Sequence, residues 1–224
     1  MIANMKLRNI ILKVSAPIYN MNYRKKNKQT EITFVSQNCI GGVLYHMLGL
    51  EFKSPTINMF IEDENFVKLA ENPRHYFQID AEPFEERHID ANDNALCYPV
   101  IKVDDILLCC QHFSNCEEAV LAWNKRRIRV NFDNIYVIAS SWNLHERKDL
   151  VERINNLPWP SVIFTTEDFG YSKCIKLAGD KWYKETSGVV HPALTSFDGL
   201  SGRRHFCREF DFVEWINCGL NENL

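Results

Sequence analysis

Residues 31–42 read EITFVSQNCIGG, and this stretch decides the fold class. Its first half, Glu31–Ser36, is a compact run of β-branched and aromatic residues, which is typical of a buried strand. Gly41 and Gly42 then open a segment whose apolar residues recur at helical spacing, and Gly49 suits the end of that helix. A strand that turns directly into a helix indicates an α/β protein.

The same alternation continues along the chain. Strands are predicted at Thr56–Ile61, Asn134–Ser140 and Ser161–Thr165, and helices at Glu64–Glu71, Ser114–Ile128 and His145–Asn155. Strands separated by helical segments of ten or more residues imply right-handed crossovers and a mainly parallel sheet. The sequence therefore predicts a three-layer α/β/α sandwich with a mainly parallel, mixed sheet, similar to Rossmann-like folds.

The remaining segments have weaker patterns. The spacing of apolar residues over 2–14 predicts a short helix that ends before Pro17, and Asn20–Gln29 is expected to be a connection. Further expectations are a β-hairpin of Tyr98–Val103 and Ile106–Gln111, a capping box of Ser114 and Glu117, and a terminal helix over Phe212–Asn217. Arg74–Asn94 is expected to be irregular, and Asp168–Leu200 to be rich in loops.

Composition indicates one globular protein. The length of 224 residues and the 46% hydrophobic and 25% charged content fit a basic arm or helix over residues 1–30 and a single α/β domain over residues 31–224. The net charge of -3 does not favour nucleic acid as a partner. Eight cysteines without a CxxC pair fit free thiols in a reducing compartment, and the chain has neither a convincing signal peptide nor a membrane-spanning stretch. We therefore expect a cytoplasmic protein.

Charge is unevenly distributed. Residues 1–28 hold seven basic side chains and no acidic one, whereas residues 80–93 hold six acidic side chains. One hypothesis is that the basic segment contacts another acidic partner or anionic lipid headgroups, in which case the protein is peripheral to the inner membrane. The alternative is a solvated leader and a charged surface loop.

The turn after the first strand is the best candidate for a ligand site. A strand end, a glycine turn and a helix start together direct backbone N–H groups toward a bound anion. Ser36 and Asn38 add short polar groups, and Cys39, Gly41 and Gly42 complete the turn. The segment matches neither GxGxxG nor a P-loop, so no cofactor is evident. The alternative is that the glycines only allow a tight turn, with Asn38 capping the helix.

Two further groups could complete the site. Cys39 could form a couple with His46 or His112, although a structural cysteine is the simpler interpretation. Arg126 and Arg129, at the end of a helix, could hold a phosphate or carboxylate, or be solvated helix-terminal bases.

Other chemistry-bearing clusters carry less weight. Arg203-Arg204-His205 is a weaker second anion clamp. Cys109, Cys110, His112 and Cys116 have the wrong spacing for zinc, and Asp104-Asp105 is interpreted as a turn, so no metal site is predicted.

Several segments resemble one bacterial family of unknown function, some of whose members are labelled exopolysaccharide biosynthesis protein. The similarity covers Phe34–Ile61, Tyr98-Pro99, His112–Ile138 and Leu157–Thr165 in order and spacing. The positions that match its motifs are Ser36, Asn38, Cys39, Gly41, Gly42, His112, Trp123, Arg126, Arg129, Asn131 and Asn134. The chain departs from the family pattern after Ser140.

The resemblance implies an α/β/α fold and a role in capsule or exopolysaccharide biosynthesis. Together with the anion site, it leads us to expect a sugar- or nucleotide-sugar-handling transferase, with a nucleotide sugar or phosphorylated sugar as ligand. The alternatives are a non-catalytic interaction or regulatory module of a polysaccharide assembly complex, and a cysteine-dependent hydrolase. The sequence does not decide between an enzyme and a binding module.

Overall fold

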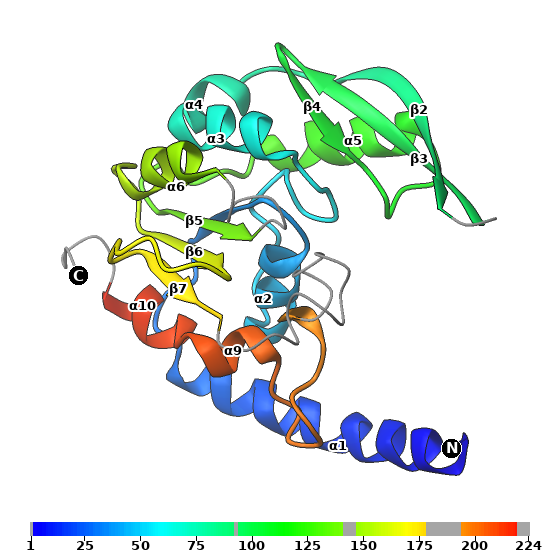
Figure 1. Ribbon diagram of the computed structural model, residues 1–224, viewed down its shortest axis with the longest axis vertical. Coiled ribbons are helices and arrows are strands. Elements are labelled where there is room, and N and C mark those ends of the chain that lie inside the picture. The colour runs from blue at the N-terminus through cyan, green and yellow to red at the C-terminus, as the bar shows by residue number, and fades with distance from the viewer. Residues whose placement is uncertain (1, 92–93, 141–146, 178–193, 219–224) are drawn as a thin grey trace.

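The computed structural model describes residues 2–91, 94–140, 147–177 and 194–218 (Figure 1). A parallel sheet has the strand order β1 (Thr33–Ser36), β5 (Ile135–Ser140), β6 (Ser161–Thr165) and β7 (Cys174–Lys176). A separate antiparallel sheet contains β2 (Glu82–Ala91), β3 (Asn94–Val103) and β4 (Ile106–Cys109). The predicted hairpin therefore belongs to its own sheet and not to the main one.

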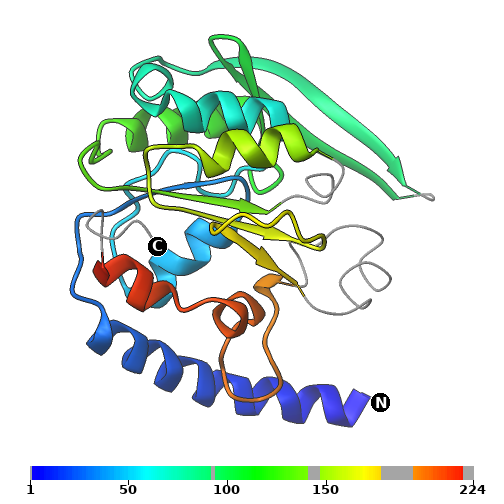
Figure 2. The same ribbon diagram turned by 60° about the vertical axis from the view of Figure 1, so that its left-hand side comes forward.

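Helices cover both faces of the parallel sheet. Because neighbouring side chains of a strand point to opposite faces, Val35 and Val137 enter one core, whereas Phe34 and Tyr136 enter the other. The first core is closed by α3 (Asp63–Glu71), α5 (Cys116–Arg127) and α6 (Lys148–Asn155). The second is closed by α2 (Ile40–Leu48), α9 (His205–Glu209) and α10 (Phe212–Cys218). Figures 1 and 2 show these two helical layers on either side of the sheet, which confirms the α/β/α sandwich.

Most predicted core elements are present. The strands β1, β5 and β6 and the helices α3 and α10 lie within one or two residues of their predicted bounds. The helix after Asn115 is also present, but its cap is displaced from the predicted Ser114. Asn115 Oδ1 accepts from Glu118 N at 2.8 Å, and Glu118 Oε2 accepts from Ser114 N at 3.0 Å. The first residues of the helix predicted at His145–Asn155, and the stretch after Ser140 that departs from the family pattern, fall on 141–146, outside the described residues.

The segment expected to be irregular contains regular structure. The short helix α4 (Pro73–Tyr76) is followed by β2, which pairs with β3 along its whole length. The described side chains of β2, Glu82–Glu86, are exposed, so this strand lacks the apolar alternation that predicts one. Backbone hydrogen bonds to β3 hold it in place instead.

The strand predicted at Thr56–Ile61 is wrong. This segment forms a buried turn, with Met59 N donating to Thr56 O at 3.2 Å and Asn58 at a left-handed φ of 65°. Only Phe60 makes an isolated bridge, to Cys109 of β4. Burial in a compact turn explains the apolar content that resembled a strand.

The N-terminal helix is longer than predicted. Helix α1 spans Ile2–Lys26 and contains Pro17, so residues 20–26 are helical and not a connection. Proline removes one intrahelical hydrogen bond, but Pro17 is exposed, and water can satisfy the carbonyl that this bond would have used. Buried Leu12 and Tyr23, on either side of the proline, fix both halves of the helix against the domain. Within the described part of the chain, no helix has both the length and the apolar character needed to cross a bilayer.

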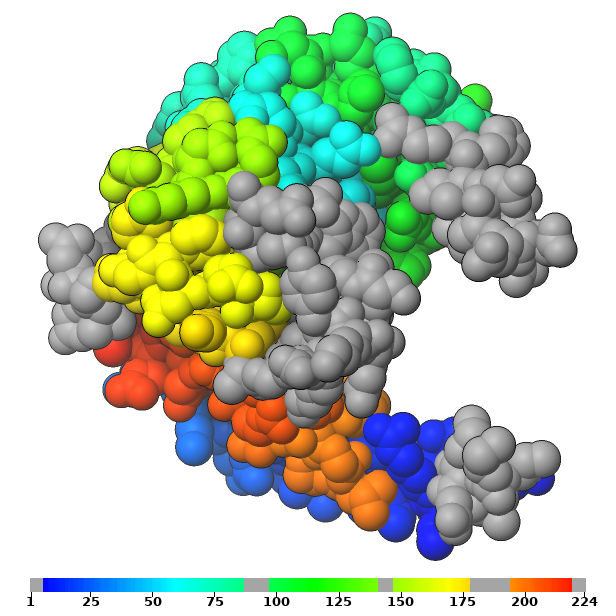
Figure 3. Space-filling model, in the orientation of Figure 1, coloured from blue at the N-terminus to red at the C-terminus, as the bar shows by residue number. Residues whose placement is uncertain are grey.

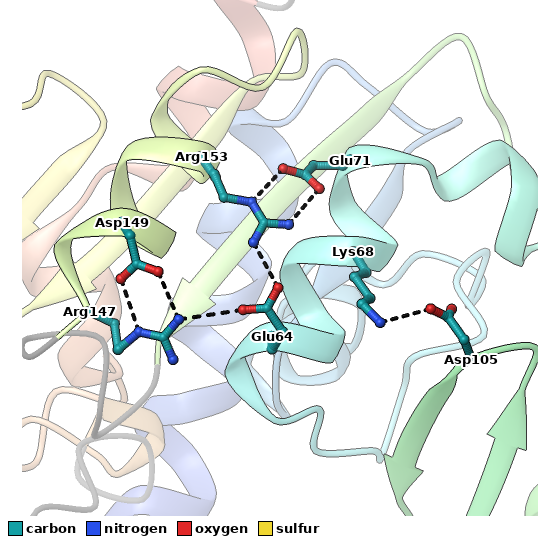
Figure 4. Close-up of polar contacts among 7 residues, drawn as sticks. All are labelled: Glu64, Lys68, Glu71, Asp105, Arg147, Asp149 and Arg153. Carbon is teal, nitrogen blue, oxygen red and sulfur yellow. Dashed lines mark hydrogen bonds and ion pairs between the residues drawn. The ribbon is translucent and has the colours of Figure 1, made fainter.

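Ion pairs join α3 to α6 and to the hairpin turn (Figure 4). Arg153 of α6 donates to Glu71 and Glu64 of α3, each at 2.8 Å. Lys68 of α3 donates to Asp105 at 2.7 Å. These side chains are between 35% and 54% exposed, so water screens the pairs and each is expected to contribute no more than about 1 kcal/mol. Their main effect is to fix the position of α3 relative to α6 and the hairpin turn.

Candidate functional site

Short hydrogen bonds fill the turn that follows β1. Ser36 Oγ donates to Asn38 O at 2.8 Å and accepts from Gly41 N at 3.1 Å. Asn38 Oδ1 accepts from Ile40 N at 3.1 Å, and its Nδ2 donates to Ser140 O at 2.6 Å. Ser36 is 0% exposed and Asn38 2% exposed. The N–H groups of Ile40 and Gly41 therefore have internal acceptors, whereas the amides around Gly41 and Gly42 are expected from the sequence to face an anion.

The two glycines pack against neighbouring side chains. A Cβ atom on Gly41 would lie 2.7 Å from Ser36 Cβ, which is closer than real contacts allow. A Cβ atom on Gly42 would lie 3.2 Å from Ile57 Cγ2. Gly41 is needed so that α2 can approach the end of β1, which supports the tight-turn alternative for this position.

Cys39 and His112 meet at the start of α2. Cys39 Sγ lies 3.2 Å from His112 Nε2. His112 belongs to the loop that follows β4, and this loop therefore lies against the turn after β1. Burial raises the pKa of the Cys39 thiol to about 11, while His112 is exposed. The pair is therefore a neutral thiol beside an imidazole, in contrast to the activated thiolate of a cysteine nucleophile. His46 is exposed on α2, and the structure pairs Cys39 with His112.

Arg126 lies half-buried near Phe113, the residue that follows His112 in the chain. Its Nη1 donates to Ile57 O at 2.8 Å, and its guanidinium carbon lies 5.9 Å from the ring centre of Phe113 and 6.0 Å from that of Phe52. Burial, and to a smaller extent the positive charge of Arg129, lower the pKa of Arg126. Among the described residues, no carboxylate forms an ion pair with Arg126.

The predicted site residues thus separate into two groups. Ser36, Asn38 and Gly41 form the internal turn. The other group, which we call the Arg126 cluster, consists of Cys39, Gly42, His112 and Arg126. Ile57 connects Gly42 with Arg126, since it contacts Gly42 and accepts the Arg126 hydrogen bond, while Cys39 and His112 contact each other. Arg129 is engaged elsewhere, in an ion pair of 2.9 Å with Glu51.

Neighbouring polar residues were not foreseen. Gln37 is fully buried, where its Nε2 donates to Asp63 at 2.7 Å and its Oε1 accepts from Ser140 N at 2.9 Å. The hydroxyl groups of Ser140 and Thr166, at the carboxyl ends of β5 and β6, are buried without a hydrogen-bond partner in the described region. Ser140 is the last residue of its buried strand and Thr166 directly follows its own, and this position could have identified them, because ligands gather at these strand ends.

The other polar clusters named from the sequence are held by internal partners. Asp104 Oδ2 lies 2.7 Å from His75 Nε2, and Asp105 accepts from Tyr76 Oη at 2.8 Å. In the second clamp, Arg203 pairs with Asp198 at 2.6 Å.

A separate groove of about 790 Å³ lies between α1 and α10. Tyr19, Tyr23 and Lys26 line it from α1, and Arg203 and Asp211 line it from the C-terminal segment. Its mixed charges favour no single class of ligand.

Comparison with known proteins places the chain in a family. Residues 10–217 match the family model described as a domain of unknown function, DUF1919. An uncharacterized protein of Haemophilus influenzae is 23% identical over 214 residues, which is 95% of this chain and 97% of that protein. Because the model covers nearly all of the chain, the protein belongs to the DUF1919 family.

Proposed function

We propose that the protein binds an anionic sugar derivative, such as a nucleotide sugar or a phosphorylated sugar, at the Arg126 cluster, and that it acts as a group transferase in exopolysaccharide or capsule biosynthesis. The observation that supports a ligand is that the guanidinium of Arg126 is half-buried without a carboxylate partner among the described residues. The polysaccharide context comes from the sequence resemblance described above.

Arg126 is a partly desolvated cation. Transfer of a charge from water into a protein costs free energy unless an opposite charge or several hydrogen bonds compensate for it. Within the described part of the chain, Arg126 makes one hydrogen bond, to a neutral carbonyl, and burial lowers its pKa. A phosphate placed against the guanidinium would supply the missing negative charge and two acceptors for its planar fork.

The surroundings of Arg126 suit such a ligand. His112 is exposed and lies at the same turn, where it can donate a second hydrogen bond. The rings of Phe52 and Phe113 lie about 6 Å from the guanidinium and limit its exposure to water, which strengthens its attraction for an anion.

The test is a thermal-shift panel of UDP-glucose, GDP-mannose, CMP-sialic acid, glucose 1-phosphate and inorganic phosphate. A ligand at about 100 times its Kd stabilises the folded state by about 2.7 kcal/mol. For a chain of this length, that corresponds to a rise in Tm of roughly 5–10 °C. Silence across the whole panel would contradict the proposal.

A matched pair of variants localises the effect. Arg126→Met removes the proposed anion contact, whereas Lys125→Met removes one charge from the neighbouring, exposed position of α5. We expect the ligand-induced shift to disappear in Arg126→Met and to remain in Lys125→Met. Equal losses in both variants would point to nonspecific attraction by the basic helix end.

A cysteine-dependent hydrolase is the second candidate, because Cys39 and His112 are within hydrogen-bond distance. This candidate requires Cys39→Ala to abolish turnover while ligand binding persists, and a normal rate in that variant would exclude it. Binding of a panel ligand without turnover of any kind would instead favour a non-catalytic interaction or regulatory module.

A further inference from the structure

Helix α1 exposes a continuous apolar stripe. Its members are Leu7, Ile10, Val14, Ile18 and Met21. Each of these side chains is between 48% and 61% exposed. Their spacing of three and four residues places them on one face of the helix. We call this face the α1 stripe.

The rest of the domain fixes the direction in which the α1 stripe faces. Leu12 and Tyr23 lie on the opposite face and are buried. Arg24 donates to the carbonyls of His46 and Met47, each at 3.0 Å, and so ties α1 to the end of α2. Figures 1 and 3 show α1 along the margin of the molecule, at the end remote from the antiparallel sheet.

A loop of the C-terminal segment packs on the inner side of α1. A Cβ atom on Gly202 would lie 2.5 Å from the Cα atom of Ala16, and Gly202 has a left-handed φ of 81°. This close contact helps to hold α1 in its orientation. The α1 stripe therefore stays directed away from the domain.

Positive charge accompanies the stripe. All seven charged side chains of residues 1–28 are basic. Lys6 and Lys13 are exposed and form no ion pair with any described residue. Arg8, Lys13 and Phe197 also line a shallow cavity of about 400 Å³, together with Asn9 and Leu12. This cavity offers two cations beside an apolar wall, and none of the described residues that line it is a carboxylate.

We propose that α1 is an interfacial helix that docks the protein onto an anionic phospholipid surface. The α1 stripe enters the boundary between headgroups and acyl chains, while the lysines and arginines contact lipid phosphates. Basic helices with one exposed apolar face bind membranes in this way. Each Lys or Arg close to an anionic bilayer strengthens binding by roughly fivefold.

The charge pattern argues against a second copy of this chain as the occupant. Two α1 helices packed through their stripes would bring only basic side chains together, because residues 1–28 contain no acid to pair with them. Like charges at such positions destabilise helix pairing. An anionic lipid surface removes this conflict.

The test measures flotation of the full-length protein with phosphatidylcholine vesicles and with vesicles that also contain phosphatidylglycerol. We expect binding to the anionic vesicles at low salt, with strong weakening near 1 M salt, where the Debye length falls to about 3 Å. Equal binding to both compositions, or no binding at low salt, would overturn the proposal.

Two pairs of variants separate the apolar and the electrostatic contributions. Ile10→Ser/Val14→Ser interrupts the α1 stripe and should abolish binding. The control Leu121→Ser/Ile128→Ser alters two still more exposed apolar residues, in α5 and directly after it, and should leave binding intact. Retained binding in the first variant would overturn the proposal. Because all four positions are exposed, circular dichroism should show an unchanged fold.

Lys6→Gln/Lys13→Gln should weaken binding to anionic vesicles by about 30-fold. The control Lys125→Gln/Lys148→Gln removes the same charge elsewhere on the surface and should leave binding unchanged. Equal weakening in both variants would show that net charge alone is responsible and would overturn the proposal.

Two other partners of the α1 stripe, a second copy of the chain and a nucleic acid, would give different experimental results. A dimer seen by light scattering that dissociates in Ile10→Ser/Val14→Ser, without vesicle binding, would identify the stripe as an interface between copies. Binding to a DNA duplex that depends on Lys6 and Lys13 but not on Ile10 and Val14, again without vesicle binding, would identify a nucleic-acid surface. Either result would overturn the proposal.

Discussion

Replacing Gly41 by alanine tests whether this glycine serves packing or ligand access. In the structure, the new Cβ atom would lie 2.7 Å from Ser36 Cβ. Ser36 is held by two hydrogen bonds in a site that is fully buried, so it cannot move without losing them. We expect Gly41→Ala to destabilise the unliganded protein.

The magnitude follows from three contributions. Overpacking of a buried site costs about 1–3 kcal/mol, and a disrupted hydrogen bond costs about 1 kcal/mol more. Alanine in place of glycine within a helix returns about 1 kcal/mol. The net loss for Gly41→Ala is therefore about 2 kcal/mol, or a fall in Tm of roughly 4–8 °C. For Gly42→Ala, only a methyl group of Ile57 must yield, by a few tenths of an ångström, so the net change should be close to zero.

Equilibrium unfolding in urea would measure these differences, and a double-mutant cycle would assign them. Ser36→Gly removes the atom that the new Cβ meets, after which the nearest neighbour is Phe34 Cβ at an ordinary 3.4 Å. The cost of Ser36→Gly/Gly41→Ala should therefore be at least about 1 kcal/mol smaller than the sum of the two single costs. Additive costs, or a stabilising Gly41→Ala, would refute the packing argument and return Gly41 to the role of admitting a ligand.

Three further predictions follow from buried or paired groups. Tyr45→Phe should lower the free energy of unfolding in urea by about 2–4 kcal/mol. The Tyr45 hydroxyl donates to the buried carbonyl of Ile32 at 2.8 Å and accepts from the buried N–H of Phe34 at 3.1 Å, and phenylalanine leaves both groups without this partner. Cys39 should resist alkylation by iodoacetamide at neutral pH and react only as the pH approaches its raised pKa of about 11, so rapid labelling at pH 7 would reveal an activated thiolate. The hydrogen bond from Arg153 lowers the pKa of Glu71, so the ionised carboxylate stabilises the fold above about pH 4.3, the pKa of an unfolded glutamate. This stabilisation is lost as the pH falls through the lower pKa of the folded state. The free energy of unfolding should therefore fall less steeply below about pH 4.3 in Glu71→Gln than in the wild type.

The sequence predicted the layers of the fold because they depend on burial. β5 and β6 are buried at every position, and such runs of β-branched residues are recognisable without knowledge of their neighbours. β2 was missed because its backbone pairing with β3 holds it in place, and this pairing leaves no pattern in the sequence. Its exposed side chains, such as Glu85 and Glu86, show no apolar alternation. The turn at Thr56–Ile61 was mistaken for a strand for the opposite reason, since its side chains are apolar but its backbone is not extended.

The sequence named residues of the candidate site but did not predict which of them lie close together. Cys39, His112 and Arg126 were all named, yet they lie far apart in the chain, and a sequence does not give the distance between Cys39 and His112. The sequence also does not predict which atoms accept the hydrogen bonds of the Ile40 and Gly41 amides. The side chains of Ser36 and Asn38 can bind either a ligand or the backbone, and the sequence pattern is the same in both cases. Only the geometry shows that these side chains point inward.

The electrostatics of this chain have to be considered locally. A net charge of -3 implies no particular attraction to a polyanion. Charges act over about one Debye length, roughly 8–10 Å, so the field at the exposed face of α1 depends mainly on the six basic residues of this helix. Such a field would attract nucleic acid and anionic lipid alike. The α1 stripe distinguishes the two, because five exposed apolar side chains gain nothing from a phosphate backbone, whereas each is stabilised by leaving water for the acyl region of a bilayer. The juxtaposition of both features on one helix, with its opposite face fixed to the domain, is therefore what favours a lipid surface.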